Sequence, residues 1–104
     1  MRFKDAAGKT VIPDGAIVCR WGKNQWTCLV EVKTGTAQLR EEQVSVYLDI
    51  AREHGFDGVL TISTQITANS DESPVAVNRQ KLRRTNLWHF SWWRVLTEAV
   101  VQQC

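Results

Sequence analysis

The sequence predicts an α/β domain built on a mixed four-stranded sheet flanked by helices. Two observations lead to this fold class. Two strand-like segments joined by a short turn predict an antiparallel hairpin near the N-terminus. A long helical segment then separates the hairpin from the next strand, and a helix of that length permits a crossover to a parallel neighbour. At 104 residues, the chain is long enough for one domain with one core.

The predicted hairpin consists of residues 9–21 and 26–34, with the polar turn GKNQ between them. Val and Ile are frequent in both segments, as is typical of strands. With the turn near residues 23 and 24, we expect residues 14–16 to lie beside residues 31–33.

Residues 36–55 show the periodicity of an amphipathic helix, with Thr36 as a candidate N-cap and Gly55 as a candidate terminator. Gln43 falls in the middle of the inward face, one turn before Tyr47. Because a buried side-chain amide needs a hydrogen-bond partner, we expect a polar group beneath this helix.

The C-terminal half continues with a strand, a loop, another strand and a helix. Residues 56–64 form a near-continuous apolar run, which is typical of a strand in a sheet covered on both faces. The composition of residues 65–80 predicts a long loop, and residues 85–90 a strand. Ser91 is predicted to cap a final helix over 92–103, whose apolar residues face the sheet.

The composition is ordinary for a soluble globular chain, with 43% hydrophobic and 23% charged residues. The formal charge of +2 neither identifies nor excludes a nucleic-acid-binding protein. The first residues are polar and do not predict a signal peptide, and no apolar run reaches transmembrane length. Three cysteines without metal-type spacing indicate free thiols in a reducing compartment, so we expect a cytoplasmic protein with no membrane partner.

Three charged residues of the hairpin form the candidate site. Glu31 and Lys33 lie two residues apart on one strand, so their side chains share a face of the sheet, and the hairpin brings Asp14 close to Glu31. Adjacent carboxylates repel each other unless a positive charge lies between them, and Lys33 or a divalent cation can supply that charge. Oxygen ligands with room for water suit Mg²⁺ or Mn²⁺ rather than Zn²⁺.

Each of these features also has an ordinary structural interpretation. Taken alone, Glu31 and Lys33 are a surface ion pair, and Asp14 in its Pro-Asp-Gly context is a turn residue. Their combination with the inward-facing Gln43 and with Tyr47 favours an active site. The RQKLRR segment leaves two interpretations open, namely sequence-independent contact with phosphates or a solvated charged surface.

The pattern Pro13-Asp14, followed about one hairpin later by Glu31-x-Lys33, resembles the motif of the PD-(D/E)XK nuclease superfamily, which is restriction-endonuclease-like. Gln43-x-x-x-Tyr47 resembles the additional motif of the helicase-associated exonuclease branch. The similarity extends over residues 10–99, because the order of elements matches the family's mixed four-stranded core as well.

The resemblance implies a Mg²⁺-dependent or Mn²⁺-dependent DNA endonuclease. It implies that Asp14, Glu31 and the backbone carbonyl of Val32 hold the metal, and that Lys33 positions the attacking water. It further implies that Gln43 supports the site. Contact with the nucleic acid would come from Gln43, Tyr47, Arg79, Lys81, Arg83 and Arg84. A non-catalytic DNA-binding or assembly module on the same fold is the alternative.

Many members of that superfamily carry a further helix before the first strand, often with another acidic residue. About a dozen residues precede Asp14 here, so the expected core lacks or truncates that first helix. A homodimer, or a partner chain or domain, could supply it. The chain also begins near a strand and stops within a helical pattern, so a fragment of a longer protein is one interpretation of this single domain, residues 1–104.

Overall fold

The computed structural model describes residues 2–103, with the backbone alone for residues 98–103. The elements in chain order are β1 (Phe3–Lys4), β2 (Thr10–Val11), β3 (Gly15–Trp21), β4 (Asn24–Val32), α1 (Glu41–Glu53), β5 (Gly58–Ser63), the 3₁₀ helix η1 (Arg79–Leu82), β6 (Asn86–Ser91) and α2 (Trp92–Gln103).

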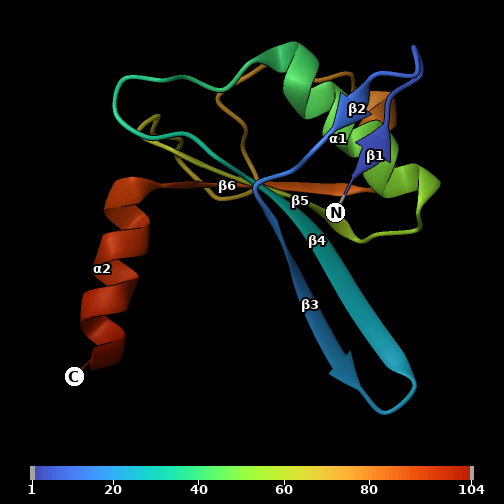
Figure 1. Cartoon of the computed structure of the whole chain (residues 1–104). Coiled ribbons are helices and arrows are strands. Elements are labelled where there is room, and N and C mark those ends of the chain that lie inside the picture. Colours follow the sequence, from blue (N-terminus) through green and yellow to red (C-terminus); the bar gives the residue numbers. More distant parts are fainter. Residues whose placement is uncertain (1, 104) are drawn as a thin grey trace.

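The main sheet has four strands in the order β3-β4-β5-β6. The β3–β4 pair is antiparallel, whereas β4–β5 and β5–β6 are parallel, so the predicted mixed sheet is confirmed. The crossover from β4 to β5 runs through α1, which lies on one face of the sheet (Figure 1). A separate two-stranded sheet, β1–β2, lies next to α1.

The β3–β4 hairpin turns at Gly22 and Lys23, two residues that the last pair, Trp21 and Asn24, encloses. Gly22 has a φ of 58°, which suits the first central position of a type II′ hairpin turn. The register is therefore shifted by two residues from the predicted one, and Gly15 pairs with Val30. Even so, Asp14 remains next to the strand segment that carries Glu31.

The helix α1 begins at Glu41, five residues after the predicted cap Thr36. Residues 36–40 are not helical. Leu39 is nevertheless buried, and its backbone N–H donates to Gln65 Oε1 at 3.0 Å. Leu39 is therefore apolar because it anchors a loop on the core, and not because it belongs to an additional helical turn. At the other end, Gly55 follows the C-cap with a φ of 70°, as predicted for a helix terminator.

The hydrophobic core lies between α1 and the face of the sheet that it covers. Leu29 of β4, Val59 of β5 and Leu87 of β6 pack there against Val44 and Leu48 of α1. Alternation along β4 directs Leu29 and Glu31 to this same face. The candidate site is therefore built at the margin of the core, where burial controls its electrostatics.

The opposite face of the sheet lacks a covering helix among the described residues. The helix α2 starts directly after β6 and leaves the sheet, as Figure 1 shows. Trp93 and Leu96 are 75% and 58% exposed, so the prediction that the apolar residues of this helix pack on the sheet is wrong for these two. The predicted Ser91 cap is present, because Arg94 N donates to Ser91 Oγ. No helix in the described part of the chain has the length and apolar character to cross a bilayer.

Candidate functional site

Asp14 occupies the bend between β2 and β3, at the start of the edge strand. Its side chain is exposed, and Oδ2 accepts a hydrogen bond of 2.7 Å from the backbone N–H of Val32. The N–H and C=O of one residue in a strand point to the same side. The carbonyl of Val32 is therefore directed towards Asp14, as a shared metal site requires.

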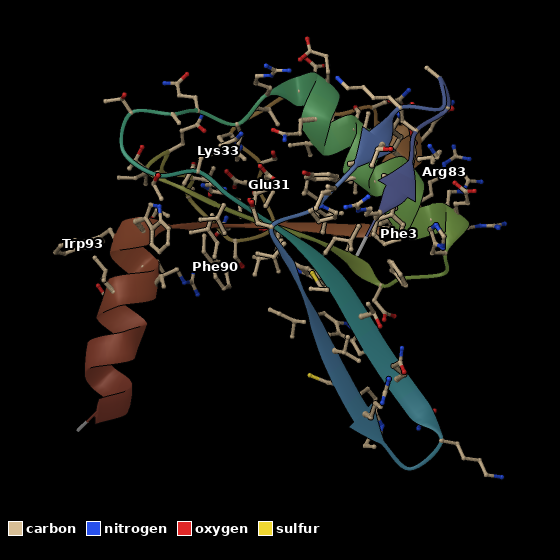
Figure 2. The ribbon with its side chains drawn as sticks, viewed as in Figure 1. Phe3, Glu31, Lys33, Arg83, Phe90 and Trp93 are labelled. Atoms are coloured by element: carbon tan, nitrogen blue, oxygen red, sulfur yellow. The ribbon has the colours of Figure 1, made fainter. Side chains whose placement is uncertain are left out.

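Glu31 and Lys33 lie on the α1 face of the sheet, at the carboxyl end of β4 (Figure 2). Their Oε1 and Nζ atoms are 3.4 Å apart. Glu31 is only 4% exposed, which rules out an exposed surface ion pair as the explanation for its position. The main chain of Lys33 is held on both sides, since its N–H donates to Ile62 O and its carbonyl accepts from Trp92 Nε1 at 2.7 Å.

The electrostatics of the site are dominated by the burial of Glu31. Burial raises the pKa of the Glu31 carboxyl above its ordinary value, and hydrogen bonding to Tyr47 opposes this rise. The charge of Asp14 raises the pKa of Glu31 further, whereas the Lys33 ammonium lowers it. The negative charge of Glu31 is thus only partly neutralised in the folded chain, and a cation bound closer to it would stabilise the ionised carboxylate.

Gln43 and Tyr47 approach the site from α1, one helical turn apart. The Gln43 amide donates to the Tyr47 hydroxyl at 3.4 Å, and Gln43 is half-buried, so its inward direction is as predicted. Its partner belongs to the same helix, however, and is not the expected polar group beneath the helix. Burial, together with the adjacent Glu31, raises the pKa of the Tyr47 hydroxyl. Tyr47 therefore remains a neutral donor that can hold the Glu31 carboxylate in place.

A hollow of about 330 Å³ opens between the N-terminal β1–β2 hairpin and the first half of α1. Gln43 and Tyr47 belong to its lining, together with Lys9 of the hairpin end and Arg40, which precedes α1. Asp5 and Glu42 also line the hollow, so its charge is mixed. Residues 3–4 and 10–11 form the small β1–β2 hairpin, which the sequence analysis did not predict and which makes a wall of this hollow.

The donors available to a cation are the carboxylates of Asp14 and Glu31 and the carbonyl oxygen of Val32. Among the side chains that the structure describes, those of residues 2–97, no group of three or more from His, Cys, Asp and Glu converges on one point. An incomplete set of hard oxygen donors fits Mg²⁺ or Mn²⁺, which keep several water ligands, and does not fit Zn²⁺. The residues present are thus compatible with the metal that the sequence predicts.

A polar row across the sheet was missed by the sequence analysis. Glu31, Thr61 and His89 are register partners on three neighbouring strands, and all three are buried. His89 Nε2 lies 2.7 Å from the carbonyl oxygen of Gln65, so this nitrogen carries a proton, while Nδ1 lies 2.9 Å from Thr61 Oγ1. Alternation along the LWHF segment, which puts His89 on the same face as Leu87, could have revealed this row.

The predicted nucleic-acid residues of the RQKLRR segment lie away from the site. Arg83 and Arg84 are exposed and precede β6, at the edge of the sheet where the parallel strands begin, whereas Lys33 follows the end of β4. Figure 2 shows Arg83 near α1, well separated from Glu31 and Lys33. Lys81 of η1 instead pairs with Asp49 of α1 at 2.8 Å. Arg79 is exposed on the same short helix.

Two cysteines, Cys19 and Cys28, occupy different environments on the hairpin. Cys28 is buried and Cys19 is exposed, and both are free thiols. They are not opposite each other, since Cys28 pairs with Ile17 and Cys19 with Trp26.

The site thus consists of Asp14, Glu31 and Lys33 at the base of the hairpin, with Gln43 and Tyr47 above them. Neither a known protein-family model nor a curated protein nor a solved structure matches this chain significantly.

Proposed function

We propose that the chain is a metal-dependent nuclease domain of the PD-(D/E)XK type that hydrolyses DNA phosphodiester bonds. The observation that carries this proposal is the buried Glu31 carboxylate, which lies 3.4 Å from Lys33 Nζ. Asp14 lies beside it, because its carboxylate accepts a hydrogen bond from the backbone N–H of Val32, the residue after Glu31. Burying a carboxylate between a second acid and a lysine lowers stability, so a role in chemistry explains the arrangement better than a role in folding does.

Each residue has a distinct role in this proposal. Asp14, Glu31 and the Val32 carbonyl would hold Mg²⁺ or Mn²⁺, and the metal would supply charge stabilisation and a more acidic water. Lys33 would orient the attacking water and exchange a proton with it. Tyr47 keeps Glu31 oriented through its hydroxyl, and Gln43 in turn contacts that hydroxyl.

The hollow beside Gln43 and Tyr47 supports a polymeric substrate. Lys9 and Arg40 line the hollow on its hairpin and helix sides, and each can contact one phosphate without reading bases. The exposed Arg83 and Arg84 lie where the parallel strands begin, at the other end of these strands from Lys33. A duplex that contacted both the hollow and these two arginines would have to extend along α1.

A second candidate, a non-catalytic DNA-binding or assembly module, is favoured by one observation. Of the side chains that the structure describes, only two acidic ones meet at the site, and Asp14 Oδ2 already accepts a backbone hydrogen bond. In such a module Lys33 would serve as the permanent counter-charge of Glu31, and no metal would bind.

The decisive experiment compares the wild type with Lys33→Met and Lys33→Arg in the cleavage of supercoiled plasmid with Mn²⁺. Lys33→Met removes the charge beside a buried carboxylate and should therefore destabilise the metal-free protein. Lys33→Arg retains the charge, but its guanidinium does not release a proton near neutral pH. We expect both variants to lose about 10²-fold or more of the cleavage rate, the usual scale for a proton-transfer group.

Calorimetric titration with Mn²⁺ gives a second, independent measurement. Binding by the wild type that disappears in Glu31→Ala supports the metal site, whereas equal binding by both proteins contradicts it. Cleavage by Lys33→Arg at the wild-type rate would show that only the charge of Lys33 matters. If the wild type neither binds metal nor cuts DNA, the non-catalytic module replaces the nuclease.

A further inference from the structure

The edge strand β3 offers an unpaired side for another strand. It pairs with β4 alone in the described sheet, over seven continuous residue pairs without a bulge. No proline or lysine interrupts residues 15–21, although natural edge strands commonly carry such residues against edge-to-edge pairing. Val18 and Trp21 are 47% and 54% exposed, so apolar side chains accompany the free backbone groups.

We propose that β3 is the interface of a homodimer, in which it pairs antiparallel with β3 of a second copy about a twofold axis at Val18. Such an isologous contact uses the same residues on both copies. It would extend each four-stranded sheet into one continuous sheet, which is a common mode of strand recognition. This interface does not depend on the proposed nuclease function.

The sizes of the β3 side chains favour a second copy as the occupant. Pairing about Val18 places residue 15 opposite residue 21, and residue 16 opposite residue 20. The small Gly15 and Ala16 would then face the large Trp21 and Arg20 of the partner subunit. A Cβ built on Gly15 meets no atom within 4 Å, so the space beside this glycine is open to the partner's Trp21.

The charges of the segment agree with the same register. Asp14 carries a negative charge just before β3, and Arg20 carries a positive charge near its end. Even-numbered residues share the α1 face of the sheet, so the partner's Arg20 would lie opposite Ala16 and diagonal to Asp14. Diagonal neighbours on paired strands are within reach of long side chains. Each copy would thus bring a guanidinium to the rim of the other copy's Asp14–Glu31 site.

The small size of the interface determines how it must be measured. Each copy contributes the seven residues of β3, whereas stable interfaces of standard size use about 20–30 residues a side. We therefore expect a reversible dimer that dissociates on dilution. Sedimentation over a concentration series should show a mass that rises from 11.9 kDa towards twice that value.

Disulfide trapping tests the register directly, in a background with Cys19→Ser and Cys104→Ser. Directly opposite residues have Cα atoms about 4.5–5.5 Å apart, which is within the range that a disulfide spans. Val18→Cys should therefore form a covalent dimer under mild oxidation. Ala16→Cys is the matched control, because its two copies would be roughly 14 Å apart, four residues along the strand. Equal trapping of both variants, or of neither, would overturn the proposed register.

A charge at the axis tests the interface without any cysteine. Val18→Asp places two carboxylates opposite each other and should abolish dimerisation, whereas Val18→Thr keeps the branched shape and should remain dimeric. Circular dichroism checks that both variants are folded. A wild type that stays monomeric at every concentration, or a Val18→Asp variant that dimerises equally well, refutes the interface. Loss of plasmid cleavage in Val18→Asp would link the dimer to the proposed nuclease, and unchanged cleavage would separate the two.

Discussion

Replacing Glu31 with glutamine removes a negative charge that the fold buries, and we expect this change to stabilise the metal-free protein. Glu31 is 4% exposed, and burial is the largest cause of the upward shift of its pKa. Lys33 Nζ at 3.4 Å compensates the charge only in part. A glutamine of the same shape can still accept the hydrogen bond from Tyr47.

The pH dependence fixes the sign of the effect. Because the pKa of Glu31 is raised by folding, the native state binds more protons than the unfolded state between the two pKa values. The free energy of unfolding of the wild type therefore falls as pH rises through this window, which begins near the ordinary Glu value of about 4.3. Below the window Glu31 is protonated in both states, and the advantage of the glutamine variant should disappear.

For a domain of this size, each 1 kcal/mol of stabilisation corresponds to a rise of about 4–8 °C in Tm, which is readily measured. Thermal unfolding followed by circular dichroism, with a chelator present and over a pH series, measures the difference. Asp14→Asn serves as the control, because it also removes one negative charge, but from an exposed side chain, and it keeps an acceptor for the Val32 N–H. Its effect on Tm should be smaller.

If the proposed metal site is correct, addition of Mn²⁺ should make the wild type more stable than Glu31→Gln, the reverse of the order expected without metal. A ligand at about 100 times its Kd stabilises the native state by about 2.7 kcal/mol. The wild type would gain this stabilisation, whereas Glu31→Gln would gain little. A wild type that is more stable than Glu31→Gln without metal at neutral pH would refute the electrostatic reasoning, as would a difference that does not change with pH.

Two further predictions concern residues outside the site. Replacing Arg83 and Arg84 with alanine should weaken DNA binding about equally for all sequences and reduce the slope of log affinity against log salt by roughly 2; unchanged affinity at low salt would assign both residues to the solvated surface. Burial, with a smaller contribution from Asp57, raises the pKa of Cys28 to about 11, and the thiolate is the reactive form. In a Cys104→Ser variant, a thiol reagent should therefore label Cys19 in the native protein and Cys28 only after unfolding, and equal labelling rates would contradict this.

The order of the elements along the chain and the convergence of Asp14 with Glu31 could be predicted, because both follow from local patterns. A turn between two strand-like segments brings together the ends of the two strands that lie away from the turn, whatever the detailed register. The observed turn at Gly22 and Lys23 shifted the register by two residues, and a two-residue shift keeps every side chain on its predicted face. Gln43 and Tyr47 were placed correctly because both fall within the part of the helix that exists.

The errors arose where long-range contacts determine the structure. Leu39 continues the helical periodicity, but the hydrogen bond that its N–H donates to Gln65, 26 residues away, stabilises a non-helical conformation there. The distance of Arg83 from Lys33, for which the sequence made no prediction, depends on where the long loop returns to the sheet, and no local pattern specifies that point. The exposure of Leu96 depends in the same way on the direction in which α2 leaves β6.

The two hydrogen bonds to the main chain of Lys33 determine which degrees of freedom remain at this position. Fixing the backbone of one residue costs about 1–2 kcal/mol of conformational entropy, and folding has already incurred that cost here. Ile62 and Trp92 hold the N–H and the carbonyl of Lys33, on either side of its Cα, so the side chain retains its own rotations while its starting point is immobile. Substitutions at position 33 therefore change the reach and the entropy of the side chain, whereas substitution of Trp92 removes one of the two hydrogen bonds that fix the backbone from which that side chain extends.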